Sequence, residues 1–275
     1  MVKKHLRSAC EIAGYNLHDL LFSPRTIMLL IAACMLTVVQ FFRLVNTAAF
    51  FKMTMNISEA TFFYAFMGFH TLMCGMIFFV MISEIPRRVS FQNYALIRSG
   101  KLAWLNGQVL YCMGTVLIFA GCMVLFSLMA ACWKTPLGFG WTGSFRLPDV
   151  QNAFPVPDWM LDQCTPLTAT LYSLILPMLF WLTVTMVMMT FGLYGMPKAG
   201  FFLISFLLII AYIYIQTDPP FTLEEFAAAL YLYPMSPGDI LPTVGGYLLL
   251  NGALYGLMAA RVTHYELADY STRDK

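Results

Sequence analysis

Six long apolar stretches constrain the fold of this chain more than any other feature of its sequence. A helix needs about 20 apolar residues to cross a bilayer, because each residue adds about 1.5 Å and the hydrocarbon is about 30 Å thick. Lipid offers the backbone no hydrogen-bond partners, and the alternation expected of barrel strands is absent, so we predict helices. The predicted spans are residues 26–45, 62–83, 109–132, 167–193, 199–215 and 244–260. The predicted fold class is an all-α integral membrane protein with six transmembrane helices.

The scarcity of charge supports this prediction. Charged residues make up 11% of the 275 residues, and hydrophobic residues make up 60%. A soluble domain is roughly 25% charged, so these side chains are too few to cover a water-facing surface. The composition excludes a soluble enzyme, a nucleic-acid-binding protein and a secreted disulfide scaffold, and it predicts membrane lipid as the surroundings. A net charge of +2 is too small to indicate a polyanionic partner.

The positions of Lys and Arg predict how the chain is oriented in the membrane. Short cytoplasmic segments carry an excess of these residues. Twelve of the 16 fall in the N-terminal segment, the connections after the second and fourth spans, and the tail; Arg43, Lys52, Lys134 and Arg146 fall on the other side. We therefore expect both termini in the cytoplasm, with residues 261–275 forming a short cytoplasmic tail.

Residues 1–25 form a separate N-terminal unit before the six-helix domain of residues 26–260. Apolar side chains recur there at helical spacing, charged ones occupy the rest of the helical wheel, and Pro24 precedes the first span. This pattern predicts an amphipathic helix in the cytoplasmic membrane interface. A surface helix packed on a soluble partner is the alternative. The apolar positions are Leu6, Ala9, Cys10, Ala13, Leu17, Leu20 and Leu21.

Two external segments are long enough to have structure of their own. Residues 133–164 are rich in Pro, Gly and Trp, and we expect them to be irregular. Residues 216–241 contain a capping box at Thr222 before an apolar helical pattern, which predicts an amphipathic or re-entrant helix before the last span. Cys132 and Cys164 lie near this outer side, where they either pair or remain free thiols.

The sequence contains no motif for catalysis, nucleotide hydrolysis or metal binding. It lacks a Gly-x-x-x-x-Gly-Lys-Ser/Thr phosphate loop, His-Glu-x-x-His, Gly-x-Ser-x-Gly and Cys-x-x-Cys. We therefore expect no catalytic residue, metal or cofactor in this chain. His70 lies in the second predicted span, where an ionisable residue is a candidate for a pathway through the bundle. A neutral imidazole hydrogen-bonded to a neighbouring helix is the alternative.

Small residues form stripes on two predicted spans. Gly107, Gly114 and Gly121 recur every seven residues, and Gly252 and Gly256 form a small-xxx-small pattern. Such stripes allow helix backbones to approach closely. We therefore expect tight helix packing there, either within the bundle or against a second copy of the chain.

The cytoplasmic loop of residues 84–104 is the most informative connection. It contains four of the twelve cytoplasmic Lys and Arg residues together with Phe91, Tyr94 and Trp104. A short helix packed under the bundle would present these side chains to a cytosolic partner. Anchoring of its Arg and Trp side chains at lipid headgroups is the alternative.

The order of these features resembles the membrane-spanning subunits of ABC-2 type transporters. The resemblance extends over nearly the whole chain. It includes a helical insertion before the last span and three local motifs. These are Leu21-Phe22-Ser23-Pro24-Arg25 at the end of the first helix, Glu-x-Pro-Arg-Arg from Glu84, and Leu96-Ile97-Arg98-Ser99-Gly100 leading to Trp104.

The resemblance implies a permease subunit of a bacterial ABC exporter in the plasma membrane. A second permease subunit, identical or related, would complete the translocation pathway, and cytosolic ATPase subunits would bind ATP and Mg. In this family the loop between spans two and three contains the coupling helix that contacts the ATPase. Carried over, the contact residues are Glu84, Arg87, Arg88, Gln92, Tyr94 and Arg98. The lack of a fused ATPase and of a large external domain favours a small bacterial system.

Two other functions remain as alternatives. A multi-pass scaffold or sensor would dock a cytosolic protein without moving a substrate. An intramembrane enzyme would centre on His70, but the sequence provides no partner nucleophile, metal-ligand pair or buried carboxylate for it.

Overall fold

The computed structural model describes residues 2–66, 68–83, 85, 99–153, 156–217 and 237–263. Its helices are α1 (Val2–Leu21), α2 (Pro24–Phe50), α3 (Ile57–Phe66), α4 (Gly68–Ile82), α6 (Lys101–Ala131), the 3₁₀ helix η1 (Ser144–Arg146), α7 (Pro148–Ala153), α8 (Asp158–Gln163), α9 (Pro166–Leu193), α10 (Pro197–Thr217) and α12 (Pro237–Thr263). No strand occurs among the described residues. The described chain is therefore all-α, as predicted.

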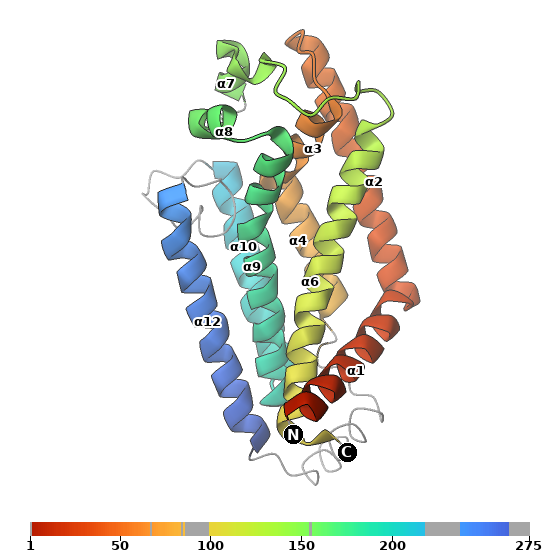
Figure 1. Ribbon diagram of the computed structural model, residues 1–275, viewed down its shortest axis with the longest axis vertical. Coiled ribbons are helices and arrows are strands. Elements are labelled where there is room, and N and C mark those ends of the chain that lie inside the picture. The colour runs from red at the N-terminus through yellow and green to blue at the C-terminus, as the bar shows by residue number, and fades with distance from the viewer. Residues whose placement is uncertain are drawn as a thin grey trace.

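The long helices run side by side along the long axis of the molecule (Figure 1). Helices α7 and α8 lie at one end, which we call the distal end, and α1 lies at the opposite, basal end. Helix α9 contacts α3, α4, α6, α10 and α12, so it is central to the bundle. Helix α1 packs mainly on the basal half of α6 and contacts α2, the helix that follows it, much less.

Local sequence explains where two long helices begin. Ser23 caps α2 by accepting a hydrogen bond from the Thr26 backbone N–H, and Pro24 occupies the first turn. Helix α9 begins in the same way, with Thr165 as the cap and Pro166 after it. Proline suits this place because the first N–H groups of a helix have no intrahelical acceptor. These short polar signals therefore set the start of each helix.

Four helices of the described chain are long and apolar enough to cross a membrane: α2, α6, α9, and α12 over Ile240–Thr263. The other two predicted spans, 62–83 and 199–215, lie on α3 with α4 and on α10, where the apolar stretches Leu72–Ile82 and Pro197–Ile210 are shorter. Many large apolar side chains on the outer faces of these helices are exposed, as a lipid-facing surface requires. These features are consistent with a multi-pass membrane protein.

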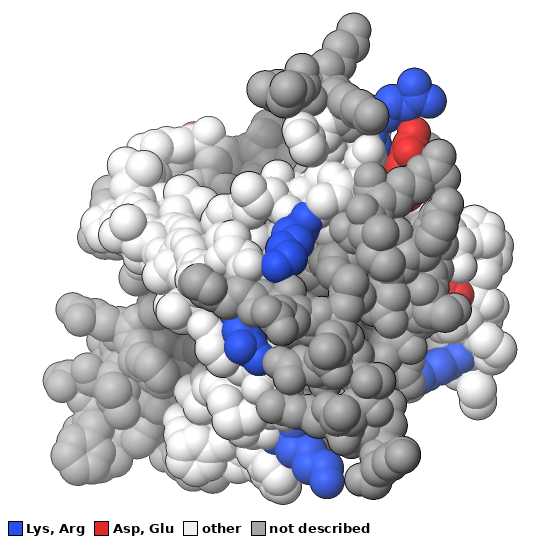
Figure 2. Space-filling model, turned by 90° about the horizontal axis from the view of Figure 1, so that it is seen from below, with Lys and Arg blue, Asp and Glu red and all other residues white. Residues whose placement is uncertain are grey.

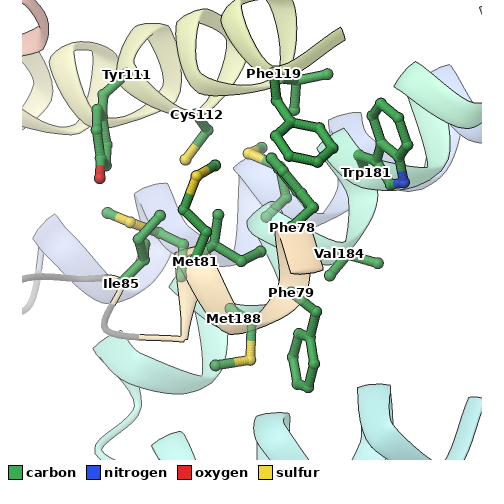
Figure 3. Close-up of a cluster of buried hydrophobic side chains, with 14 of the residues drawn as sticks. Phe78, Phe79, Met81, Ile85, Tyr111, Cys112, Phe119, Trp181, Val184 and Met188 are labelled. Carbon is green, nitrogen blue, oxygen red and sulfur yellow. The ribbon is translucent and has the colours of Figure 1, made fainter. Parts of the chain in front are cut away.

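The core between α4, α6 and α9 is aromatic (Figure 3). Phe78 stacks on Trp181 with ring centroids 5.6 Å apart, and both rings contact Phe119. All three side chains are almost completely buried. Within a bilayer, close van der Waals packing of this kind holds helices together, because lipid tails are as apolar as the side chains.

Helix α1 coincides with the predicted N-terminal helix and buries much of its predicted apolar stripe, since Ala9, Ala13 and Leu20 are buried, although the face that packs is not the whole stripe. Ile12 and Asn16 are buried, whereas Leu6 is 61% exposed and Cys10 is exposed. The difference arises because α1 packs lengthwise on α6. Side chains that fit against that helix are buried, and part of the broad apolar stripe is left outside.

The distal segment 133–164 is more regular than expected. It contains η1, α7 and α8, and the Trp141 indole N–H donates a 2.7 Å hydrogen bond to the Cys164 carbonyl oxygen. Such short helices escape detection because they are shorter than the window in which helical periodicity is visible. The predicted helix of residues 216–241 falls mainly on residues 218–236, which lie outside the described chain.

Candidate functional site

The predicted coupling loop leaves and re-enters the bundle at the basal end. Its six predicted contact residues all lie outside the described chain: Glu84, Arg87, Arg88, Gln92, Tyr94 and Arg98. The residues on both sides of this connecting segment, defined as residues 84–98, are described. The residues on each side of the segment contact other helices, and these contacts determine which helices are connected to it.

Arg25, in the first turn of α2, holds the first side of the connecting segment. Its Nη2 atom donates to the Val80 carbonyl oxygen at 2.6 Å and to Ser83 Oγ at 2.7 Å. Both acceptors lie at the C-terminal end of α4, where carbonyl groups lack intrahelical N–H partners and a positive charge is favourable to the helix dipole. Helix α2 is therefore tied to the end of α4.

Ile85 anchors the same side in the core. Its side chain is 3% exposed, and its backbone N–H donates to the Ile82 carbonyl oxygen at 2.9 Å. Figure 3 shows Ile85 in the buried cluster with Met81 of α4 and Tyr111 of α6. Ile85 is therefore fixed between these two helices.

Gly100 and Lys101 hold the other side. Gly100 has a φ of +86°, a conformation that favours glycine, and its carbonyl oxygen accepts the Trp104 N–H at 3.0 Å to begin α6. Lys101 Nζ donates to the carbonyl oxygen of Thr263, the last residue of α12, at 2.9 Å. This side is therefore joined both to α6 and to the end of α12.

Two of the predicted glycines bring α1 against α6. A Cβ atom at Gly107 would lie 2.9 Å from Ile12 Cβ and 3.0 Å from the Ala9 carbonyl oxygen. A Cβ atom at Gly114 would lie 2.8 Å from Leu17 Cδ1. Only glycine at position 107 allows the two backbones to approach this closely.

A buried amide pair sets the position of α1 along α6. Asn16 Nδ2 donates to Gln108 Oε1 at 3.3 Å, and both side chains are buried. A buried polar group that loses its partner destabilises the fold. The pair therefore opposes any shift of α1 along its axis.

Among the described residues, the basal end presents mainly positive charge. Figure 2, which views this end, shows Lys and Arg side chains across its surface and Asp and Glu side chains at its edge. Arg7 pairs with Glu11 at 2.9 Å on the exposed face of α1, and Lys198 is exposed. Arg261 lies over the Tyr194 ring, 5.6 Å from its centroid. This distribution suits a partner with an acidic surface.

The arrangement at the basal end can transmit movement. The connecting segment joins α4 to α6; Arg25 links the end of α4 to α2, and Lys101 links the start of α6 to α12. A displacement of the segment would therefore reach four helices.

Among the described residues, no three His, Cys, Asp or Glu side chains lie close enough together to hold a metal ion.

Glu59 forms a second polar site, at the distal end, to which the sequence analysis assigned no role. It is fully buried in the first turn of α3. Its Oε2 accepts the Asn56 N–H at 2.9 Å, and Asn56 Oδ1 accepts the Glu59 N–H at 3.0 Å, which is a reciprocal capping box. Its Oε1 accepts the Thr142 N–H at 2.6 Å and the Thr142 hydroxyl at 3.0 Å. In the sequence, the Asn-x-x-Glu spacing of residues 56–59 is the pattern from which this helix start could have been predicted.

The surroundings of Glu59 change its acidity and join the distal segment to α3. Burial raises the pKa of Glu59 above its ordinary value of 4.5, and hydrogen bonds from backbone N–H groups partly oppose this. Trp141 and Phe145 both stand edge-on to Phe62 of α3. One carboxyl group and one aromatic cluster therefore hold the distal segment in place.

The remaining predicted positions are scattered. His70 lies on α4, and its side chain is outside the described part of the structure. Gly121, Gly252 and Gly256 have no described atom from elsewhere within 4 Å of a Cβ built on them. Of the two alternatives for Cys132 and Cys164, the structure has the free thiols.

Comparison with protein-family models, with curated proteins and with solved structures found no match. The chain's function is therefore inferred from its residues and their contacts.

Proposed function

We propose that this chain is the permease subunit of an ABC-2 type exporter and works with separate cytosolic ATPase subunits. Six spans cross the bacterial plasma membrane, formed by α2, by residues 62–83 of α3 and α4, and by α6, α9, α10 and α12. The basal end and both termini face the cytoplasm. A second permease subunit, identical or related, completes the pathway, and the ATPase subunits bind ATP and Mg.

The observation that carries the proposal is the attachment of both sides of the connecting segment to long helices. Arg25 links its first side to α2, and Lys101 links its last side to α12. A connection that only joined two spans would need neither link. Both links suit a segment that receives a push from a cytosolic partner.

The proposed mechanism uses these links to move the bundle. Closure of the ATPase dimer on ATP pushes the connecting segment, where Arg87 and Arg88 donate charge-assisted hydrogen bonds to carboxylates of the ATPase. The push reaches α4 and α6 directly, and it reaches α2 and α12 through Arg25 and Lys101. Helices that shift as rigid bodies then switch the bundle between inward-facing and outward-facing states.

Helix α1 braces the same contact in this proposal. Its outer face carries the exposed Arg7–Glu11 pair, and its inner face is held on α6 by Asn16 and Ile12. A partner that presses on α1 therefore also presses on α6.

Purification of the tagged chain from its native membrane tests the proposal. We expect an ATPase subunit with a phosphate-binding loop to co-purify, and we expect the reconstituted complex to hydrolyse ATP. Arg87→Ala/Arg88→Ala should lower ATPase activity and subunit affinity by about tenfold, equivalent to about 1.4 kcal/mol. Lys52→Ala/Lys134→Ala removes the same charge from the distal end and should leave both quantities unchanged.

The outcomes separate the proposal from its alternative. Unchanged assembly and ATPase activity after Arg87→Ala/Arg88→Ala would show that the assigned contact is wrong. A stoichiometric cytosolic partner without a phosphate-binding loop would contradict the exporter and support a scaffold or sensor.

A further inference from the structure

We infer that the chain binds an anionic phospholipid where α2 and α6 meet near the distal end. The α2–α6 lipid site consists of Phe42 and Arg43 on α2 and of Trp133 and Lys134 directly after α6. The inference requires that α2 and α6 lie in a bilayer, and it does not depend on the proposed transport function.

The spacing of basic residues along α2 places Arg43 at a membrane boundary. Arg25 and Arg43 lie in one continuous helix, about 27 Å apart along its axis. No charged residue occurs between them. The hydrocarbon core of a bilayer is about 30 Å thick. When Arg25 lies at the basal headgroup layer, Arg43 therefore lies at the distal one.

An aromatic pair joins the two helices at the same level. The rings of Phe42 and Trp133 meet edge-on, with centroids 5.9 Å apart. Phe42 is 43% exposed and Trp133 is 67% exposed, so both rings also face outward. Partly exposed aromatic side chains at this depth are typical of the boundary between membrane and water.

The two cations beside these rings have no partner within the described chain. Arg43 and Lys134 directly follow Phe42 and Trp133 in sequence, and both are exposed. Neither makes a hydrogen bond or ion pair with its side chain among the described residues, whereas Arg146, also at the distal end, pairs with Asp162 at 2.6 Å. Two unpaired cations at a headgroup layer are complementary to a phosphate group.

Apolar surface continues from the site toward the basal end. One turn before each ring, Val39 of α2 is 55% exposed and Met129 of α6 is 61% exposed. Positive charge at the boundary is thus combined with apolar contacts on the hydrocarbon side. A phospholipid has a negatively charged headgroup and apolar chains to match these two surfaces, whereas a soluble anion has only the negative charge.

Quenching of Trp133 fluorescence by brominated phospholipids tests the site. The purified chain is reconstituted into phosphatidylcholine vesicles that contain increasing fractions of brominated phosphatidylglycerol or of brominated phosphatidylcholine. The signal of Trp133 is the difference between the unmodified chain and Trp133→Phe. We expect phosphatidylglycerol to bind next to Trp133 at least about fivefold more tightly than phosphatidylcholine, from the effect of a basic residue at a membrane surface.

Charge variants show whether the two cations cause the preference. Arg43→Gln/Lys134→Gln should reduce the preference to near unity and leave quenching by brominated phosphatidylcholine unchanged. Arg7→Gln/Lys198→Gln removes two cations from the basal end and should keep the preference. Circular dichroism checks that each variant folds. If the double variant Arg43→Gln/Lys134→Gln does not fold, the single variant Arg43→Gln is measured in its place.

Three results would overturn the inference. One is equal binding of the two lipids to the unmodified chain, and another is an unchanged preference in the folded Arg43 variant. The third is the absence of quenching by either lipid, because Trp133 would then lie outside the bilayer.

Discussion

Arg25 and Ser83 are joined by a hydrogen bond of 2.7 Å between Nη2 and Oγ, although 58 residues separate them in the chain. The same nitrogen reaches the Val80 carbonyl oxygen at 2.6 Å. This contact connects the first turn of α2 with the residue that follows α4. Arg25 therefore ties the start of α2 to the end of α4.

Replacement of Arg25 by alanine should lower the free energy of unfolding by about 1 kcal/mol, because two hydrogen bonds are lost at a partly exposed site. Arg25→Lys keeps the charge but not the planar guanidinium whose Nη2 donates to both oxygens, so it should recover only part of the loss. Thermal unfolding in detergent measures these differences. Lys198→Ala removes an exposed cation at the same end and should change the free energy by less than about 0.5 kcal/mol. Equal stability of Arg25→Ala and Lys198→Ala would contradict the assigned role.

The three glycines of α6 should respond to alanine in a graded way. Gly107→Ala should destabilise the fold by about 1–3 kcal/mol, because the new Cβ meets the Ile12 Cβ and the backbone of Ala9. Gly114→Ala should cost less, since it meets only the flexible end of Leu17. Gly121→Ala enters open space and should stabilise the helix by up to about 1 kcal/mol. Unfolding of the three variants in one detergent measures the order, and a Gly107→Ala variant as stable as Gly121→Ala would contradict the close approach of α1.

The Glu59 carboxyl should make the stability of the fold decrease as pH rises. Burial raises its pKa in the folded chain above the ordinary 4.5, so the folded chain holds this proton more tightly than the unfolded chain does. The contribution of this carboxyl to the free energy of unfolding is fully present below pH 4.5, and it is lost as pH rises through the pKa of the folded chain. Unfolding of the unmodified chain and of Glu59→Gln, followed from about pH 4 to about pH 8, measures this effect.

The test is how the difference in stability between the unmodified chain and Glu59→Gln changes with pH. The amide of Glu59→Gln removes one hydrogen-bond acceptor at every pH alike, but it cannot ionise. The stability of the unmodified chain relative to Glu59→Gln should therefore fall with pH and then level off. Asp149→Asn, which removes an exposed carboxylate at the same end, is the matched control. A difference in stability between the unmodified chain and Glu59→Gln that stays constant with pH would rule out the raised pKa.

Cysteine labelling should reveal the orientation of the chain. Cys10 on α1 and Cys132 after α6 are both exposed, and they lie toward opposite ends of the molecule. A membrane-impermeant maleimide added to intact cells should label Cys132 and spare Cys10, and permeabilised cells should allow both to react. Cys10→Ser and Cys132→Ser assign each signal in mass spectra. Labelling of Cys10 from outside intact cells would contradict the predicted cytoplasmic basal end.

The apolar pattern of the sequence was sufficient to locate the long helices, but not all of their ends. Each predicted span lies on helices of the structure. Helix α6 begins at Lys101 and not at residue 109, because polar residues such as Gln108 are buried against α1 and so continue the helix beyond its apolar part. A hydropathy pattern cannot reveal a polar turn that another helix covers.

Contacts between distant residues were the part that the pattern could not predict. Glu59 and Thr142 are 83 positions apart, and the capping-box spacing near Glu59 indicates only where a helix begins. In the sequence, Arg25 ends a local motif after the first helix and Lys101 is one of the basic residues of the predicted loop, and neither pattern indicates what these side chains contact. Their role as links at the basal end depends on the ends of α4 and α12, which no local pattern places beside them.

The packing of α1 on α6 can form only after α6 has been synthesised. Ile12 and Gly107 are about 95 residues apart, a length that a ribosome adding about 5–20 residues per second needs about 5–20 s to make. Throughout that interval the inner face of α1 has no α6 to cover it, and the bilayer surface is the apolar phase within reach. An amphipathic helix in the membrane interface, as predicted from the sequence, would cover this face during that interval. In the complete chain, α6 covers this face at Gly107 and Gly114.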